Sequence, residues 1–113
     1  MRPSKTKSFK EIPSVAEKTI WRKDLAEAIA ALRDADEVMR FLADVCTPGE
    51  IMDIADRWHV AKLLDEGTHS YRDINAMTGI SVTTVARVAR FLQQEPHQGY
   101  RLVLDRLRKS AKS

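Results

Sequence analysis

The sequence predicts an all-α fold, and three observations support this prediction. Apolar residues recur every three or four positions through most of the chain, which is the spacing of one helix face. Residues that begin and end helices punctuate these segments. No segment alternates apolar and polar residues as a half-buried strand does, and no internal repeat is present. The 113 residues suffice for one domain, which we place at residues 14–110.

The charge of the chain is unevenly distributed. Lys and Arg number 19 and Asp and Glu number 16, so the net charge is only +3. The first ten residues and the segment after Ala86 are nevertheless basic, whereas the segment from Asp24 to Asp56 is rich in acids. This asymmetry indicates a basic face that meets an anionic partner.

Residues 1–13 mix Lys, Ser and Pro with few large apolar residues, so we expect a flexible basic tail there. The tail lacks the apolar core of a secretory signal, and no apolar run in the chain is long enough to span a bilayer. Cys46 is the only cysteine, which rules out an intrachain disulfide framework. We therefore expect a cytoplasmic protein that does not enter a membrane.

A first amphipathic helix is predicted from about Val15 to Arg33, and the segment from Asp34 to Asp36 separates it from a second. The apolar residues of the two helices are Ile20, Trp21, Leu25, Ala28, Ile29 and Leu32, then Val38, Phe41, Leu42 and Val45. These wide stripes need more cover than the short helices that follow can offer. We therefore expect homodimerisation through this N-terminal half.

The clearest helix start is Thr47-Pro48-Gly49-Glu50, which combines an N-cap Thr, Pro at the first helical position and Glu at the third. The helix should end near Gly67. Its expected inward residues are Ile51, Ile54, Ala55, Trp58, Ala61 and Leu64.

The segment from Ser70 to Leu92 has the pattern of a helix-turn-helix. Ser70 with Asp73 suits the start of a short helix, Gly79 suits a sharp turn, and Ser81 suits the start of a second helix. Ile80 is expected to be a buried plug, and Ile74 and Met77 form the apolar face of the short helix. Val85, Val88 and Leu92 form the apolar stripe of the second helix.

Thr83, Thr84, Arg87 and Arg90 lie mostly off this stripe. Hydroxyl side chains near a helix start, followed by arginines one turn apart, suit a helix that reads base edges and grips phosphates. The alternative is an ordinary helical hairpin with a solvated polar face. Pro96 should stop this helix, and a last helix carries Tyr100, Val103, Leu104 and Leu107 on one face.

Three stretches, CTPGEIMDIADRWHVAKLLDEG, SYRDI and TGISVTTVARVARFL, follow in unbroken register over about half of the chain. On these stretches the chain resembles the tryptophan-repressor family of bacterial transcription regulators, and it looks most similar to the YerC/YecD branch of that family. The resemblance implies six helices, an intertwined homodimer and docking of the helix-turn-helix in the major groove of DNA, for which this family's repressor is a standard example. It assigns DNA contacts to Tyr71, Arg72, Asn75, Ser81, Val82, Thr83, Thr84 and Ala86.

The resemblance also implies a site for a small effector. Thr47, Arg57 and Arg87 correspond to the threonine and two arginines that hold tryptophan in responsive members of the family. Val88 and Phe91 stand where those repressors have a glycine and a serine, and their side chains would fill space that the ligand needs. Tryptophan is therefore not the expected ligand, and another effector or none remains open.

Other chemistry finds little support in the sequence. His59, His69 and His97 lack partners at metal-ligand spacing, so we predict no metal site and no cofactor. Cys46 is expected to be a buried structural thiol, and Trp21 and Trp58 are expected to be core residues. No catalytic constellation is present, so an enzyme is not expected.

The sequence thus predicts a homodimeric, sequence-specific regulator that binds double-stranded DNA and most simply represses transcription. Two alternatives remain open at this point. One is a module in which the same helices dock a protein partner, and the other is an accessory protein that binds DNA without sequence preference.

Overall fold

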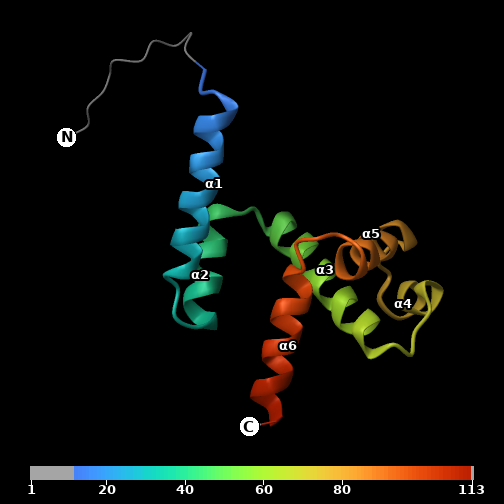
Figure 1. Cartoon of the computed structure of the whole chain (residues 1–113). Coiled ribbons are helices and arrows are strands. Elements are labelled where there is room, and N and C mark those ends of the chain that lie inside the picture. Colours follow the sequence, from blue (N-terminus) through green and yellow to red (C-terminus); the bar gives the residue numbers. More distant parts are fainter. Residues whose placement is uncertain (1–11, 113) are drawn as a thin grey trace. The chain divides into compact units, whose positions relative to one another are not determined.

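A computed structural model of the chain describes residues 12–112, and these residues form six helices and no strand (Figure 1). The helices are α1 (Val15–Ala30), α2 (Ala35–Val45), α3 (Pro48–Glu66), α4 (Tyr71–Thr78), α5 (Val82–Gln93) and α6 (Gly99–Lys112). The all-α prediction is confirmed. Residues 1–11 of the predicted basic tail lie outside the described residues.

Short polar side chains set the starts of the helices. Thr47 and Ser70 each form a reciprocal capping box, in which the cap side chain accepts from the backbone N–H three residues ahead. Ser14 forms a third box at the start of α1, which the sequence pattern had not singled out. Because each box satisfies two backbone N–H groups, the helices begin at residues that the local sequence defines.

Two glycines end helices in the left-handed conformation. Gly67 after α3 and Gly79 after α4 both have φ of 77°, where a side chain would be strained. Both ends were predicted. The helix α5 ends at Gln93, shortly before Pro96.

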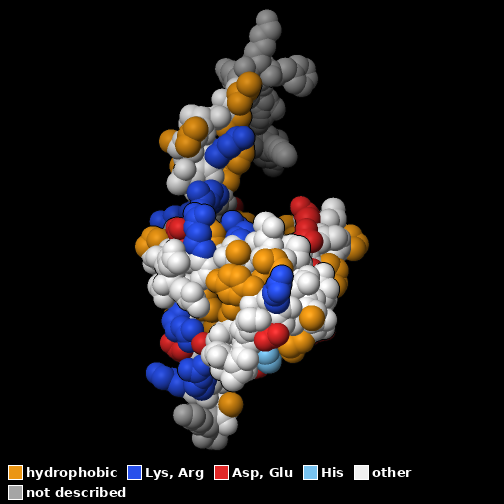
Figure 2. All heavy atoms as spheres, turned by 90° about the vertical axis from the view of Figure 1, so that its right-hand side faces the viewer, with side chains coloured by type: hydrophobic (Ala, Val, Ile, Leu, Met, Phe, Trp, Pro, Cys, Tyr) orange, Lys and Arg blue, Asp and Glu red, His pale blue; other side chains and the backbone are white. Residues whose placement is uncertain are grey.

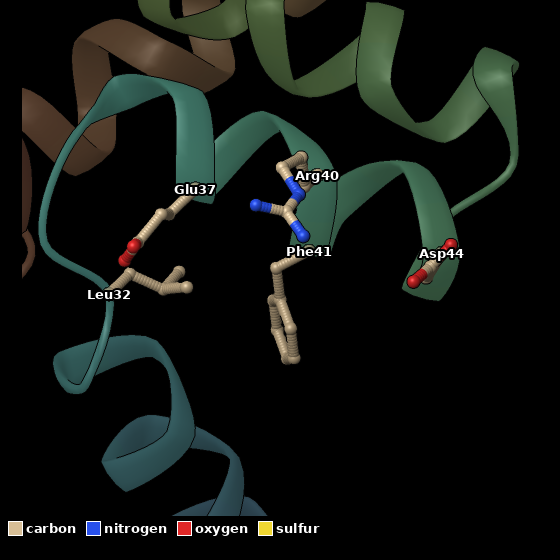
Figure 3. Close-up of a pocket in the computed structure, with 5 residues that line it drawn as sticks. All are labelled: Leu32, Glu37, Arg40, Phe41 and Asp44. Atoms are coloured by element: carbon tan, nitrogen blue, oxygen red, sulfur yellow. The ribbon is translucent and has the colours of Figure 1, made fainter.

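The chain divides into two compact units, and the first, the N-terminal unit, is residues 1–45. No side chain of α1 or α2 is buried. Trp21, which we expected in a core, is 55 % exposed, and Leu25 is 46 % exposed. A hollow of about 330 Å³ is lined by Leu32, Glu37, Arg40, Phe41 and Asp44. Figure 3 shows Leu32 reaching it from the turn after α1, and the other four from α2.

The second unit, the C-terminal unit, is residues 46–113, and it contains the buried core. The helices α3 and α4 both pack on α5, and α6 packs on α3 and α5. Ile74, Val60, Val85 and Val88 are the largest fully buried side chains, and each comes from one of the three helices that precede α6. This division into units does not test the prediction of one domain over residues 14–110, which stays a prediction.

Some predicted inward residues lie at the surface of the C-terminal unit. In α3, burial is confined to Val60, Ala61 and Leu63 in its second half, so Ile54 is left 46 % exposed. Met77 is 57 % exposed because α4 buries only Ile74. The pattern of α6 was likewise only partly right: Leu104 is buried and Tyr100 half-buried, but Val103 and Leu107 are exposed.

An ion-pair cluster ties the end of α3 to α6. Asp65 accepts from Arg101 at 2.6 Å and from Arg108 at 2.5 Å. Arg101 also donates to Asp105 at 3.1 Å, one turn along α6. The hydrogen bond from Arg101, opposed by partial burial, lowers the pKa of Asp65 below its ordinary value of 3.8. The cluster therefore fixes α6 against α3 at neutral pH.

Candidate nucleic-acid interface

The turn between α4 and α5 is held by its own polar groups. The amide of Asn75 donates to the carbonyl of Ile80 at 2.9 Å, and the backbone N–H of Ile80 donates to the hydroxyl of Thr78 at 3.0 Å. The backbone N–H of Gly79 donates to the carbonyl of Asn75 at 2.8 Å. Ile80, the predicted plug, is half-buried against the core. These bonds fix the direction in which α5 leaves the turn.

The start of α5 is set by Ser81. Its hydroxyl accepts from the backbone N–H of Thr84 and donates to the hydroxyl of Thr84, both at 3.1 Å. One face of α5 is buried, through Val85, Val88, Ala89 and Leu92. The other face is open to solvent, with exposed residues at Val82, Thr83, Ala86, Arg87 and Arg90. The residues predicted to lie off the apolar stripe are thus on the outer face, except Thr84, which is half-buried.

On the side of the molecule where α4 and α5 lie, an area of hydrophobic side chains occupies the centre, with charged side chains around it (Figure 2). Exposed apolar residues of these two helices include Tyr71, Met77 and Val82, which are 41 %, 57 % and 44 % exposed. Arg72 is also exposed, on the first turn of α4. The outer surface of the helix-turn-helix is therefore mixed, with apolar side chains beside basic ones.

The first turn of α4 carries a carboxylate in a fixed position. Asp73 accepts from the backbone N–H of Ser70 at 3.0 Å, and its own N–H donates to the hydroxyl of Ser70 at 3.0 Å. The hydrogen bond from the Ser70 backbone lowers the pKa of Asp73 from its ordinary value of 3.8. Asp73 thus serves the helix start and leaves Tyr71 and Arg72 as the outward residues of this turn.

Two arginines of α5 share one aromatic ring. The guanidinium carbon of Arg87 lies 4.4 Å from the centroid of the Phe91 ring, and that of Arg90 lies 5.3 Å from it. The ring of His97 is stacked near Phe91, with the centroids 6.5 Å apart. Arg90 also donates to Glu95 at 2.8 Å. A guanidinium that rests on an aromatic face does not use its N–H groups in that contact. Arg87 is therefore oriented with its charge available, whereas Arg90 is also paired with Glu95.

Two of the five residues that the resemblance assigns to an effector line one hollow. Arg57 of α3 and Arg87 of α5 border a space of about 260 Å³, together with Asp53, Asp56 and Thr84. Its lining is entirely polar or charged. The two aspartates had escaped the sequence analysis, although the i, i+4 spacing of Asp53 and Arg57 places both on one face of a helix.

The other three residues of that set lie elsewhere in the C-terminal unit. Thr47 is the N-cap of α3 and accepts from the backbone N–H of Glu50 at 3.1 Å. Val88 is 1 % exposed and belongs to the core. Phe91 lies beneath the guanidinium of Arg87. The hollow is therefore lined by charged side chains and Thr84, and neither Val88 nor Phe91 contributes to its lining.

No group of three or more His, Cys, Asp or Glu among residues 12–112 is arranged to hold a metal ion. None of the helices in this described range is long and apolar enough to cross a membrane.

Comparison with known proteins covers most of the chain. The family described as Trp repressor protein matches residues 21–108. The chain is 38 % identical over 86 residues to the "Uncharacterized protein YerC" of Bacillus subtilis, a match that covers 76 % of this chain and 81 % of that protein.

Solved structures show the same similarity. The crystal structure of a TrpR-like protein from Eubacterium eligens has a TM-score of 0.72 at 42 % identity, covering 80 % of this chain and 91 % of that one. The crystal structure of a Staphylococcus aureus protein has a TM-score of 0.73 at 32 % identity, covering 85 % and 96 %. Both helices of the candidate interface fall within the matched family segment.

Proposed function

Since the chain belongs to the Trp repressor protein family, we propose that it is a sequence-specific DNA-binding regulator of transcription that acts as a homodimer. The observation that carries the proposal is the division of α5 into two faces. One face is the core of the C-terminal unit, and the other exposes the first turn of the helix followed by Arg87 and Arg90. This arrangement suits docking in the major groove, with base edges at the helix start and phosphates at the arginines.

The homodimer is supported by the N-terminal unit. Ile20, Trp21, Leu25 and Ile29 of α1 are between 46 % and 65 % exposed. Isolated helices of this length are marginal in water, and such an apolar surface is more typical of an interface than of a free surface. A second copy would cover it and would present two α5 helices to a pseudo-palindromic target. Repression would then follow from occupation of a promoter, in the cytoplasm.

An effector would bind at the hollow between α3 and α5. Arg57 and Arg87 offer guanidinium groups to an anionic ligand, while Asp53 and Asp56 add negative charge beside them. A ligand there would have to carry both charges in a compact form, so we propose a small zwitterion or no effector. Tryptophan is not the proposed ligand, because Phe91 rather than a ligand ring lies against Arg87.

The experiment that tests this function is selection of bound duplexes from a random DNA pool at moderate salt, with and without a mixture of amino acids. We expect one pseudo-palindromic sequence to emerge, and a difference between the two runs would identify an effector. Weak binding without sequence preference in both runs would contradict the proposal. It would instead favour an accessory or protein-docking role for the same helices.

Arginine variants test where DNA binds. The double variant Arg87→Ala, Arg90→Ala should weaken binding to all sequences and reduce the dependence of affinity on salt, because phosphate contacts release counterions. The matched control is Arg22→Ala, Lys23→Ala, which removes the same charge from exposed positions of α1. Undiminished binding by the folded Arg87 and Arg90 variant would exclude this face as the DNA-binding face.

A further inference from the structure

The outer face of the first turns of α5 carries small apolar and hydroxyl side chains. Val82 is the first residue of the helix and is 44 % exposed, and Thr83 and Ala86 are also exposed. Val82 and Ala86 are four residues apart, so they lie on the same side of the helix one turn from each other. A helix that enters a groove with its N-terminal end presents these positions to the bases first.

The longer polar side chains around this face are already engaged within the chain. Asn75 donates its amide to the carbonyl of Ile80, and Thr84 accepts from the hydroxyl of Ser81. The bonds of Asn75 hold the turn and those of Thr84 hold the helix start. Both side chains keep further donor and acceptor capacity, but these bonds hold them in place, and both are only half-exposed, whereas Val82, Thr83 and Ala86 are exposed.

The arginines of α5 lie further along the helix. Arg90 is paired with Glu95 at 2.8 Å, and Arg87 rests on the ring of Phe91. Both are placed at least one turn beyond Val82, where they suit phosphates better than base edges at the helix start. In the first turns of α5, two of the exposed outward side chains, Val82 and Ala86, are apolar, and Thr83 lies beside them.

We propose, on the basis of the proposed function, that α5 recognises its DNA target chiefly through the 5-methyl groups of thymines, which Val82 and Ala86 contact in the major groove. The thymine methyl is the apolar feature that unmodified base pairs display in that groove. Val82 and Ala86 exclude water from it, and a cytosine at the same place would present a polar amino group to an apolar side chain, whose desolvation is unfavourable. The target is therefore duplex DNA with A·T pairs opposite the start of α5.

Uracil substitution tests this inference directly. In the duplex obtained by selection, each thymine is replaced in turn by deoxyuridine, which removes the methyl group and retains base pairing and every hydrogen-bonding group. We expect about a four-fold loss of affinity at one or two thymines of each half-site, as for one methyl-sized group removed from apolar contact. Thymines elsewhere in the duplex should tolerate the replacement.

A pair of matched variants assigns the effect to Val82. Val82→Ser removes both methyl groups of the side chain and leaves a hydroxyl, so the loss on uracil substitution should disappear at the thymine that Val82 contacts. Val103→Ser makes the same change on α6 at a residue with the same exposure of 44 %, and should leave the loss intact. Because the measurement compares two duplexes with one protein, a uniform change in affinity does not affect it.

The possible outcomes distinguish a failure of thymine-methyl recognition from a failure of the proposed function. If a single sequence is selected but every thymine tolerates uracil, methyl recognition is overturned and the regulator remains. A loss that is the same in Val82→Ser and in the unmodified protein would overturn the role of Val82. If no sequence is selected at all, both the proposed function and this inference are overturned.

Discussion

The N-terminal and C-terminal units are both built from helices that carry apolar residues, but only the C-terminal unit buries such residues. In α4 and α5 the apolar residues of the inner face are covered, and Ile74 and Val85 are both 0 % exposed. In α1 the same kinds of residue lie open, and Ile20 and Trp21 are 65 % and 55 % exposed. The difference does not lie in how the helices begin, since α1 and α4 both start with a serine capping box.

The comparison shows that local helix signals and tertiary burial are separate properties of this chain. The C-terminal unit satisfies both, because α3, α4 and α6 surround α5. The N-terminal unit satisfies only the first. Most of the stability of a helix in a protein comes from packing of its apolar face, and α1 and α2 bury no side chain.

Truncation of an isoleucine should lower the free energy of unfolding of the C-terminal unit only when that isoleucine belongs to its core. Ile74→Ala should lower the free energy of unfolding by roughly 2–5 kcal/mol, because it leaves a cavity in the core. Ile20→Ala removes the same atoms from a side chain that is 65 % exposed, and should leave the unfolding of the C-terminal unit unchanged. Denaturant unfolding at a fixed protein concentration measures both. Equal losses in the two variants would abolish the contrast.

Trp21→Ala should act on association. If a second copy covers α1, truncation of a central tryptophan costs about 2 kcal/mol or more, which corresponds to a dissociation constant raised roughly thirty-fold. Sedimentation over a dilution series measures this shift. The control is Trp58→Ala, since Trp58 packs against the core of the C-terminal unit and its loss should lower stability in unfolding experiments. An unmodified chain that is monomeric at all concentrations would contradict the prediction.

These contrasts also explain what the sequence could predict. The helix boundaries at Thr47, Gly67 and Gly79 depend on residues within one turn, and the structure confirms all three. The outer face of α5 was likewise predicted, because periodicity alone separates Arg87 and Thr83 from the buried stripe. Local chemistry and helical spacing were sufficient at these places.

Contacts between residues far apart in the sequence could not be predicted from local residue types and helical spacing. Arg101 and Asp65 are 36 residues apart, and nothing in their local sequence pairs them. The stacking of Arg87 on Phe91 depends on side-chain conformation as well as spacing. Trp21 was expected in a core because its neighbours are aliphatic, but the pattern cannot say which surface supplies the cover.

The smallest expected effect concerns the ion pairs between α3 and α6. Asp65→Asn should cost about 1 kcal/mol or less at neutral pH, since partly exposed ion pairs contribute little. The pKa of Asp65 is lowered in the folded protein, so its stabilising contribution is complete above the ordinary value of 3.8 and is lost as the pH falls through the lowered pKa.

The measurement is the free energy of unfolding of both proteins between pH 2 and about pH 7, a range that brackets the ordinary pKa of Asp65. The difference between the unmodified protein and Asp65→Asn should be constant above about pH 5 and shrink below 3.8. Moderate salt should reduce it at neutral pH, because partly exposed charges are screened. A difference that grows as the pH falls would reverse the assigned sign.

The way in which the turn between α4 and α5 is held affects which substitutions the protein can accept during evolution. Its hydrogen bonds are supplied by Asn75, Thr78 and the backbone, and none involves the outward side chains of Val82, Thr83 or Ala86. Substitution at those three positions therefore leaves the turn and the core untouched, and exposed positions of this kind usually alter stability by less than about 0.5 kcal/mol. If these positions contact DNA, as proposed, the DNA target can change one residue at a time while the fold is retained.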